Sequence, residues 1–223
     1  MVLAARREAE LNAVAEEIRG KGGRADVCQL DCGDTKAVQD AVAEWGERTG
    51  GLDLVIANAG VGITGPAHKL GWEHLGPVLQ VNVLGAFATL HAAMTHMLPR
   101  GKGTIVGVSS LASMRGLPAS GAYSASKAAL ATFLETLRID LKRKGLTVVD
   151  VRPGFVDTAM TQRNRFKMPF LMNVEDAAKV TLAGIDRGDA VVAYPWPTAA
   201  AMSMAEAAPG ALWRVLASKV KMS

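Results

Sequence analysis

The stretch from Gly103 to Lys127 constrains the fold of this chain more than any other. It opens with an uncharged, partly β-branched run over 104–108, a pattern typical of a strand buried on both faces of a parallel sheet. Two serines, the second of them Ser110, follow the strand at its carboxyl end, where open α/β sheets place their ligands. A loop then leads to a predicted helix that carries Tyr123 four residues before Lys127. This spacing sets both side chains on one helical face, so a hydroxyl, a phenol and an ammonium group are predicted to converge.

Such a trio suits proton transfer coupled to the reduction of a carbonyl group. A carbonyl that receives hydride needs a proton for its new alkoxide, and the reverse reaction needs a proton removed. A phenol has a pKa of about 10, so a nearby cation is required to stabilise its phenolate at neutral pH. Lys127 is positioned to do this for Tyr123, and the Ser110 hydroxyl is positioned to hydrogen-bond the reacting oxygen. A lysine four residues after a tyrosine can occur by chance, so this spacing alone is weak evidence and the interpretation depends on the motifs around it.

The rest of the chain alternates between predicted strands and helices. Short β-branched runs are separated by longer segments with a helical apolar period. This alternation predicts βαβ units and an α/β fold with a doubly wound, Rossmann-like parallel sheet, in one domain over 1–223. The expected strands are 1–5, 25–30, 52–57, 104–108, 146–151 and 190–194, and the expected helices are 7–19, 35–48, 72–98, 123–144 and 174–187.

Composition and charge exclude several classes of protein. Apolar residues make up 49% and charged residues 21% of the 223-residue chain, which is ordinary for a soluble enzyme. The net charge of +4 comes from scattered basic residues, so no nucleic-acid surface is expected. Cys28 and Cys32 are too far apart in an extended strand for a disulfide and have no second pair for zinc, so no metal is expected. The longest uncharged run, 190–205, is broken by prolines, so membrane association is not expected. We find no signal peptide, so a cytoplasmic location is expected.

These residues together resemble the short-chain dehydrogenase/reductase family. The resemblance is a series of spaced motifs that covers nearly the whole chain. Ser110 stands thirteen residues before Tyr123, as the catalytic serine does in that family. The other matching positions are an acidic residue at a strand end (Asp31), an Asn-Ala-Gly motif in which Ala57 replaces a preceding Asn (Asn58, Ala59, Gly60), a helical asparagine (Asn82), and a Pro-Gly segment (Pro153, Gly154, Val156, Thr158).

The resemblance implies a role for each of these residues. Tyr123 would be the general acid/base, Lys127 would lower the pKa of Tyr123 and bond the nicotinamide ribose, and Ser110 would polarise the carbonyl. Asn82 would help to hold a water for proton relay. The remaining positions would bind the cofactor: Asp31 near the adenine, Asn58, Ala59 and Gly60 after their strand, and Pro153, Gly154, Val156 and Thr158 around the nicotinamide.

Simpler structural roles stand beside three of these assignments. Asp31 could be a helix N-cap, although Asp34 or Thr35 is better positioned for that role. Asn82 could be a solvated or locally bonded polar residue within its helix. The Pro153–Gly154 pair could be an ordinary turn at the end of a strand.

The end of the first strand indicates the choice of cofactor. Members of the family that select NAD resemble one another in carrying an acidic residue there, to bond the ribose 2′-hydroxyl. Ala5 occupies this position here and Arg6 follows it. A guanidinium can pair with a 2′-phosphate, so NADP is the expected cofactor and NAD the alternative. Arg6 could also be a solvated residue at the start of a helix.

The family also has an opening strand and a Thr-Gly-x-x-x-Gly-x-Gly loop that binds the pyrophosphate, and we find neither in this sequence. The first strand here corresponds to the family's second. The sheet is therefore expected to lack one interior strand and to leave two strand edges unpaired. Two explanations stay open, a written start that lies downstream of the true one or a genuine truncation, and we favour the first.

The variable segments suggest the substrate and the assembly. Apolar residues between 158 and 173 suggest a lid over a hydrophobic carbonyl or alcohol. Broad apolar surfaces on helices 72–98 and 123–144 fit the family's pairing of these helices in a homodimer or homotetramer. The main hypothesis is thus an NADP-dependent oxidoreductase, and its alternative is a non-catalytic or weakly active subunit. An epimerase of the family's extended branch would need a longer substrate domain than this chain has.

Overall fold

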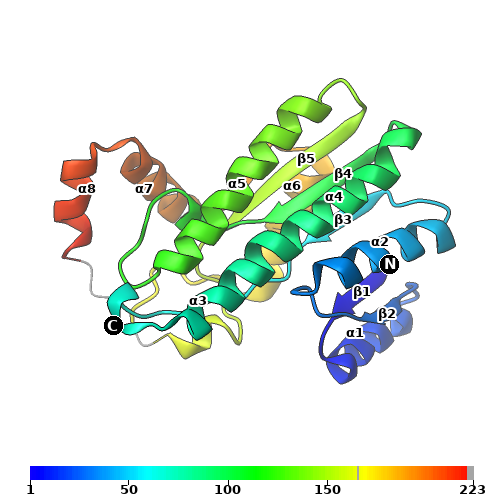
Figure 1. The fold of residues 1–223 in the computed structure, drawn as a ribbon, viewed down its shortest axis with the longest axis horizontal. Helices are drawn as coiled ribbons and strands as arrows, with labels where there is room; N and C mark the ends of the chain where they lie inside the picture. Colours follow the sequence, from blue (N-terminus) through cyan, green and yellow to red (C-terminus); the bar gives the residue numbers. More distant parts are fainter. Residues whose placement is uncertain (165, 220–223) are drawn as a thin grey trace.

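The computed structural model describes residues 1–164 and 166–219 and contains alternating strands and helices (Figure 1). The strands are β1 (Val2–Ala5), β2 (Asp26–Gln29), β3 (Leu54–Ala57), β4 (Gly103–Val108), β5 (Leu146–Pro153) and β6 (Val191–Tyr194). The helices are α1 (Glu8–Gly20), α2 (Thr35–Arg48), α3 (Trp72–Leu79), α4 (Ala86–Met97), α5 (Gly121–Leu141), α6 (Val174–Arg187), α7 (Trp196–Ala207) and α8 (Gly210–Ala217). Each strand and helix predicted from the sequence is present within a few residues of its expected bounds.

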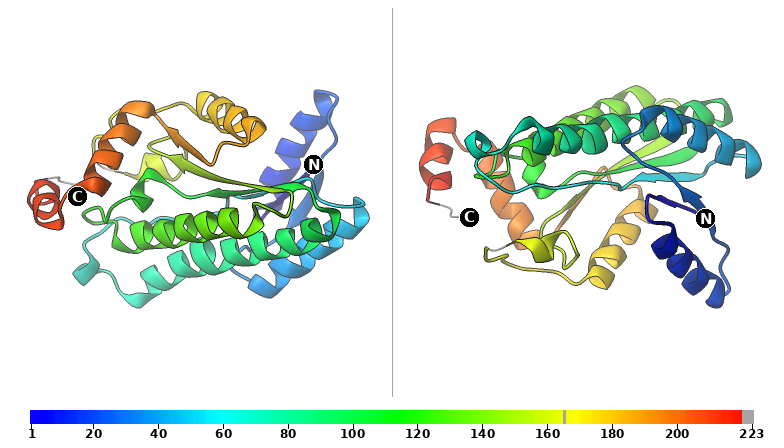
Figure 2. Two further views of the ribbon diagram at one scale, coloured as in Figure 1. Left: turned by 90° about the horizontal axis from the view of Figure 1, so that it is seen from above. Right: turned by 60° about the horizontal axis from the view of Figure 1, so that its bottom comes forward.

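The fold is a doubly wound parallel sheet, as predicted. All strand pairs are parallel, and β4 and β5 share the longest register, from Gly103 opposite Leu146 to Val108 opposite Val151. Helices α2, α4 and α5 cover one face, whereas α1 and α6 cover the other (Figure 2). Because both faces are covered, β4 buries neighbouring residues on opposite sides: Ile105 packs with α4 and α5, and Val106 packs in the cluster that includes α6.

The sheet is interrupted between β1 and β3, where the missing strand was expected. Its two parts have the orders β1-β2 and β3-β4-β5-β6, so within residues 1–164 and 166–219 β1 and β3 each have a strand partner on one side only. A cleft of about 470 Å³ separates the two parts, and apolar side chains such as Val42 and Trp45 of α2 contribute to its lining. The predicted pair of unpaired strand edges is therefore confirmed.

The predicted helix 72–98 is continuous but not regular. Between α3 and α4 the backbone widens into a π-helical turn, Gln80–Gly85. At Gly85 the helix touches the loop after β2, and a Cβ at this glycine would lie 1.8 Å from the carbonyl oxygen of Cys32. The whole helical segment from Trp72 to Arg100 is long and apolar enough to cross a membrane, but 44% of its most apolar stretch is buried in the fold. It is a core helix that packs against α2, β3 and β4.

Candidate active site

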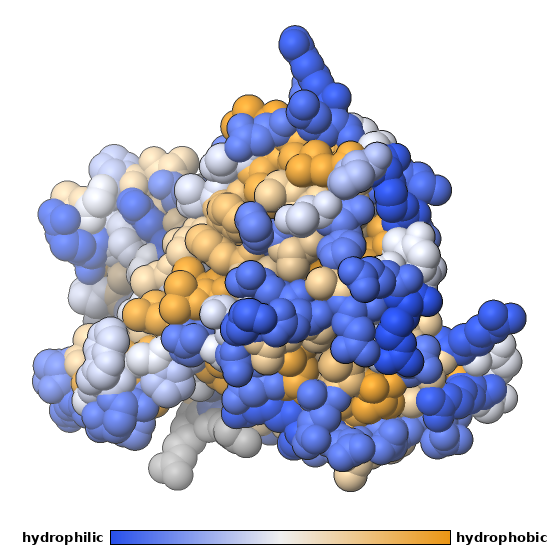
Figure 3. All heavy atoms as spheres, turned by 45° about the vertical axis from the view of Figure 1, so that its right-hand side comes forward, coloured by the Kyte–Doolittle hydropathy of each residue, from blue (hydrophilic) through white to orange (hydrophobic). Residues whose placement is uncertain are grey.

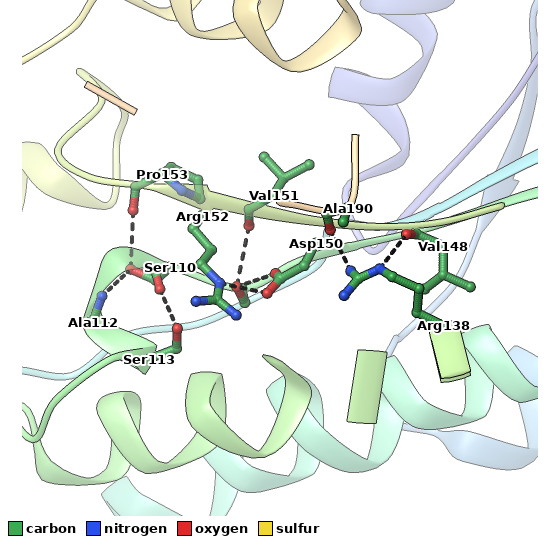
Figure 4. Close-up of polar contacts among 11 residues, drawn as sticks. Ser110, Ala112, Ser113, Arg138, Val148, Asp150, Val151, Arg152, Pro153 and Ala190 are labelled. Atoms are coloured by element: carbon green, nitrogen blue, oxygen red, sulfur yellow. Dashed lines mark hydrogen bonds and ion pairs between the residues drawn. The ribbon is translucent and has the colours of Figure 1, made fainter. Parts of the chain in front are cut away.

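The end of β4 brings Ser110 to the carboxyl edge of the sheet. Its side chain is nearly buried, with 6% of the residue exposed. The hydroxyl donates a hydrogen bond to the carbonyl oxygen of Pro153, at 3.2 Å, and accepts one from the amide of Ala112, at 3.1 Å. The bond to Pro153 links the ends of β4 and β5, and the bond from Ala112 is local to the turn, so the serine hydroxyl has a defined position (Figure 4).

Tyr123 and Lys127 lie in the first two turns of α5, which begins at Gly121. The Lys127 ammonium donates a hydrogen bond of 2.7 Å to the carbonyl oxygen of Val108, at the end of β4, and lies 5.8 Å from the centre of the Tyr123 ring. The Ser110 side chain interacts with the Tyr123 hydroxyl. The structure thus brings together the three side chains that the sequence predicted would converge.

Burial controls the ionisation of this pair. Burial raises the pKa of the Tyr123 phenol above its ordinary value, and the interaction with Ser110 opposes that rise. Burial also lowers the pKa of Lys127 from 10.5 to about 8, and the negative charge of Asp150 opposes that fall. The family resemblance predicted that the pKa of Tyr123 would be lowered. The pKa is instead raised above its ordinary value, because loss of solvent outweighs stabilisation of the phenolate.

Asn82 is completely buried within the π-helical turn and is not the solvated residue that was considered as an alternative. Its Oδ1 accepts from the amide of Val61 at 2.8 Å, and its Nδ2 donates to the carbonyl of Val61 at 2.9 Å and to Ser126 Oγ at 3.0 Å. The carboxamide therefore ties the loop after β3 to α5. In that loop a Cβ at Gly60 would lie 3.4 Å from both Asn82 Oδ1 and Lys127 Nζ, a close approach that a glycine keeps open.

Two groups of predicted cofactor-binding residues follow β3 and β5, the second of them predicted to hold the nicotinamide. Asn58, Ala59 and Gly60 come directly after β3. After β5, the Gly154 amide donates to the carbonyl of Tyr194 at 2.7 Å, so the Pro-Gly turn is bonded to the end of β6. Further along, Val156 forms a parallel bridge with Met172, and the Thr158 amide donates to Thr161 Oγ1 at 2.9 Å. Both strand ends reach the edge that carries Ser110, because the sheet is parallel.

The two residues predicted to face the adenine end lie on the other part of the sheet. Arg6 and Asp31 are exposed and follow β1 and β2 respectively. The Asp31 carboxylate accepts from the amide of Gly33 at 2.8 Å. The N-cap of α2 is Asp34, whose side chain accepts from the amides of Lys36 and Ala37, so Asp31 is not that cap. Its carboxylate instead stabilises a local turn after β2.

Three further buried residues shape the site. Ser109 is the first of the two serines expected after the strand at 104–108 and had no assigned role, whereas Ser126 and Asp150 were not singled out from the sequence. Ser126 accepts from Asn82 and donates to the carbonyl of Tyr123 at 2.8 Å. Ser109 Oγ donates to Asp150 Oδ1 at 2.5 Å, beneath the Ser110 turn. The sequence does point to Asp150, because a carboxylate within the apolar run 148–151 is expected to be buried and therefore to need a hydrogen-bonding partner.

The described residues suit the nicotinamide half of a dinucleotide but not its diphosphate. A phenol, an ammonium and the close-approach Gly60 gather where a nicotinamide and its ribose would lie. A diphosphate needs the free amides of a helix N-terminus. The first turn of α1 carries Glu8 and Glu10 instead, whose charges disfavour an anion. Among the described residues no group of His, Cys, Asp and Glu could hold a metal ion.

Comparisons with known proteins agree with this geometry. Residues 1–168 match the family model described as short chain dehydrogenase. An uncharacterized oxidoreductase of Myxococcus xanthus is 43% identical over 218 residues, which is 98% of this chain and 86% of the relative. The chain belongs to the short-chain dehydrogenase/reductase family. As a member it is an oxidoreductase that acts on CH–OH groups with a nicotinamide cofactor.

Solved structures of the family share the fold. An alcohol dehydrogenase from Thermococcus sibiricus, complexed with 5-hydroxy-NADP, superimposes with a TM-score of 0.77 at 25% identity, covering 86% of this chain and 84% of that one. A short-chain dehydrogenase from Sphingobium yanoikuyae in complex with NADPH gives a TM-score of 0.82 at 23% identity, covering all of this chain and 87% of that one. The second likeness, at its lower identity, supports the fold alone.

Proposed function

We propose that this short-chain dehydrogenase/reductase interconverts a ketone or aldehyde and an alcohol, with NADP as cofactor and Tyr123 as general acid/base. The observation that carries the proposal is the convergence of Ser110, Tyr123 and Lys127 in a buried site. The cofactor, when bound, supplies or accepts the hydride. The Ser110 hydroxyl turns from the Pro153 carbonyl to donate to the substrate oxygen, and the Tyr123 hydroxyl delivers the proton to the same oxygen.

The raised pKa of Tyr123 favours carbonyl reduction at neutral pH. A buried phenol is protonated there and is ready to act as an acid. Oxidation of an alcohol requires the phenolate, which forms only at higher pH. Lys127 keeps its hydrogen bond to the Val108 carbonyl while its charge faces the site and favours the phenolate when the proton leaves. Asn82 holds the adjoining loop and, in this proposal, the water that resupplies the proton.

NADP is proposed because Arg6 follows β1 at the cofactor edge. A guanidinium at this position suits a 2′-phosphate. The Thermococcus alcohol dehydrogenase of similar fold was solved with an NADP derivative, which supports the same choice. The Asp31 carboxylate lies nearby and could instead receive a ribose hydroxyl, so NAD is the alternative cofactor.

The substrate is proposed to be a small hydrophobic carbonyl compound. The segment after β5 carries Phe155 and Phe166 in edge-to-face contact, with ring centres 5.9 Å apart. Phe170 in the same segment is 61% exposed, an apolar surface suited to a nonpolar ligand. Met160 faces Gly62 close to the Tyr123 ring, which brings this segment to the reacting group.

We also propose a homodimer or homotetramer in the cytoplasm. The helices that the sequence indicated for assembly expose large apolar side chains, including Leu84 at 50% and Ile139 at 71%. Apolar residues also form broad bands on the molecular surface (Figure 3). Sedimentation of the chain and of an Ile139→Glu variant tests the assembly, and an unchanged mass would remove α5 from the interface.

A pair of tyrosine variants tests the chemistry. The chain has two tyrosines, of which Tyr194 is buried and Tyr123 is partly buried. Tyr123→Phe is expected to lower turnover by at least about 10²-fold without changing the fold, because it removes the proton donor. Tyr194→Phe is the matched control, since its hydroxyl bonds Thr181 of α6 at 2.8 Å and the substitution keeps the backbone carbonyl that binds Gly154. Equal turnover in both variants would contradict the role of Tyr123.

Cofactor binding separates the proposal from its alternative. Fluorescence titration with NADPH and, in parallel, NADH is expected to give micromolar binding with NADPH preferred. Replacing Arg6 by alanine is expected to reduce that preference, whereas Arg7→Ala, which breaks an exposed ion pair with Glu10, is not. Absence of binding to both nucleotides would favour the non-catalytic subunit.

A further inference from the structure

A buried carboxylate lies directly behind the candidate active site. Asp150 is wholly inaccessible to solvent and sits in the middle of β5, on the face covered by α5. Its Oδ1 accepts from Ser109 Oγ at 2.5 Å, and its Oδ2 accepts from Arg152 Nε at 2.6 Å (Figure 4). Among the carboxylates of the described residues it is the one that is buried.

Burial of this carboxylate reduces the stability of the fold. Removing a carboxylate from water costs several kcal/mol, and an ion pair repays that cost only with additional hydrogen bonds. An apolar residue would fill the same space without this cost, as Val149 and Val151 do on the opposite face. The charge therefore calls for an explanation beyond packing.

The two partners of Asp150 are neighbours in sequence of the backbone carbonyls that bind Lys127 and Ser110. Its partner Ser109 stands between Val108, whose carbonyl binds the Lys127 ammonium, and Ser110. On the other strand, Arg152 precedes Pro153, whose carbonyl accepts from the Ser110 hydroxyl. The Ser109–Asp150 bond joins β4 to β5 at the level where both active-site contacts begin.

The charges around Lys127 come from two elements. Tyr123 lies beside it on α5, and the charge of Asp150 acts on it from β5, where Asp150 pairs with Arg152, whose side chain is 18% exposed. The loop after β3 and the π-helical turn present Gly60 and Asn82, which carry no charge. Asp150 is thus the negative group that favours the protonated amine, whereas burial disfavours it.

We propose that Asp150 is a positioning residue of the active site, which fixes the ends of β4 and β5 through Ser109 and Arg152 and supplies a buried negative charge behind the Val108 carbonyl that binds the Lys127 ammonium. This role rests on the proposed function of Lys127. Loss of the charge releases the lysine proton at lower pH and narrows the pH range in which the site can transfer a proton.

Direct titration of Lys127 tests the proposal without reference to activity. In protein labelled with ¹³C and ¹⁵N at lysine, the Lys127 Nζ signal is identified by its absence in Lys127→Met and followed from pH 6 to 11. Asp150→Asn keeps the shape and the acceptor for Ser109 and is expected to lower the midpoint by about half a unit or more. Ser109→Ala, which removes the bond and keeps the charge, is the matched control and is expected to leave the midpoint in place.

A double variant guards against loss of folding. Asp150→Val with Arg152→Met leaves no unpaired ion and is expected to shift the Lys127 midpoint in the same direction, by a smaller amount. An unchanged midpoint in Asp150→Asn, or in the double variant if the single one does not fold, would overturn the proposal. So would an equal shift in Ser109→Ala. Failure of the proposed function would appear differently, as a parent protein that reduces no carbonyl while its Lys127 titration responds to Asp150.

Discussion

Burial of the Lys127 ammonium has a consequence for stability that can be measured. The residue is 4% exposed, and its pKa falls from 10.5 to about 8. The folded state therefore holds this proton less tightly than the unfolded chain does. The protonated lysine destabilises the fold by about 3 kcal/mol at neutral pH, and this penalty is relieved as the pH rises from about 8 to 10.5.

Replacing Lys127 by methionine keeps an unbranched side chain and removes the charge. Between pH 7 and 9.5 the free energy of unfolding of the parent should rise by about 2 kcal/mol relative to the variant, because the parent sheds its penalty over this range. At pH 7 the variant should be stabilised by less than the full penalty, since the Val108 carbonyl loses its donor at a cost of about 1–3 kcal/mol. The difference between the two pH dependences is thus the decisive quantity.

Urea denaturation of both proteins at pH 7 and 9.5 measures that difference. Burial raises the pKa of Cys32, which makes the fold less stable at high pH, but this effect is common to both proteins and cancels. Lys142→Met, at the exposed end of α5, serves as the control and should follow the parent at both pH values. Parallel pH dependences of the parent and Lys127→Met would refute the reasoning, because they would mean that folding leaves the pKa of Lys127 unchanged.

Three further outcomes follow from the site and its supports. Carbonyl reduction should fall above about pH 8 as Lys127 loses its proton, whereas alcohol oxidation should rise toward higher pH as the Tyr123 phenolate forms, and initial rates in both directions measure this. Gly85→Ala should destabilise the fold by more than about 3 kcal/mol, because its Cβ meets the Cys32 carbonyl, whereas Gly20→Ala enters open space and should change thermal stability by less than about 1 kcal/mol. Incubation with a chelator should leave turnover unchanged, and a loss would reveal a metal site.

The sequence predicts the fold well where the information is local. Strand and helix periods locate the parallel sheet, and the strand order of the family predicts the interruption between β1 and β3. The π-helical turn at Gln80–Gly85 escapes such reasoning, since it accompanies the contact of Gly85 with a carbonyl more than fifty residues earlier. The expected elements end at strand 190–194, and only the structure shows that α7 and α8 follow it, on either side of Pro209.

The candidate site shows the same division between local and distant information. The spacing of Ser110, Tyr123 and Lys127 predicts their convergence, because a strand end and one helical face determine it. The direction of the Tyr123 pKa depends on how deeply α5 is buried, which no local pattern reports. The hydrogen-bond partner of Asp150 is Ser109, which follows another strand and lies 41 residues away in sequence, so the pattern around Asp150 does not identify that partner.

The buried polar groups of this chain gather around the end of β4 and the start of α5. They include Asn82, Ser110, Lys127 and Asp150, and the opposite end of the sheet buries mostly apolar side chains. A fold selected for stability alone would disperse or remove such groups, because each one costs free energy when it leaves water. Hydride transfer, however, requires a site from which water is excluded and in which donors are already oriented. The apolar cores on both faces of the sheet hold these groups in place, and the pKa shifts of Tyr123 and Lys127 are the measurable cost of that exclusion.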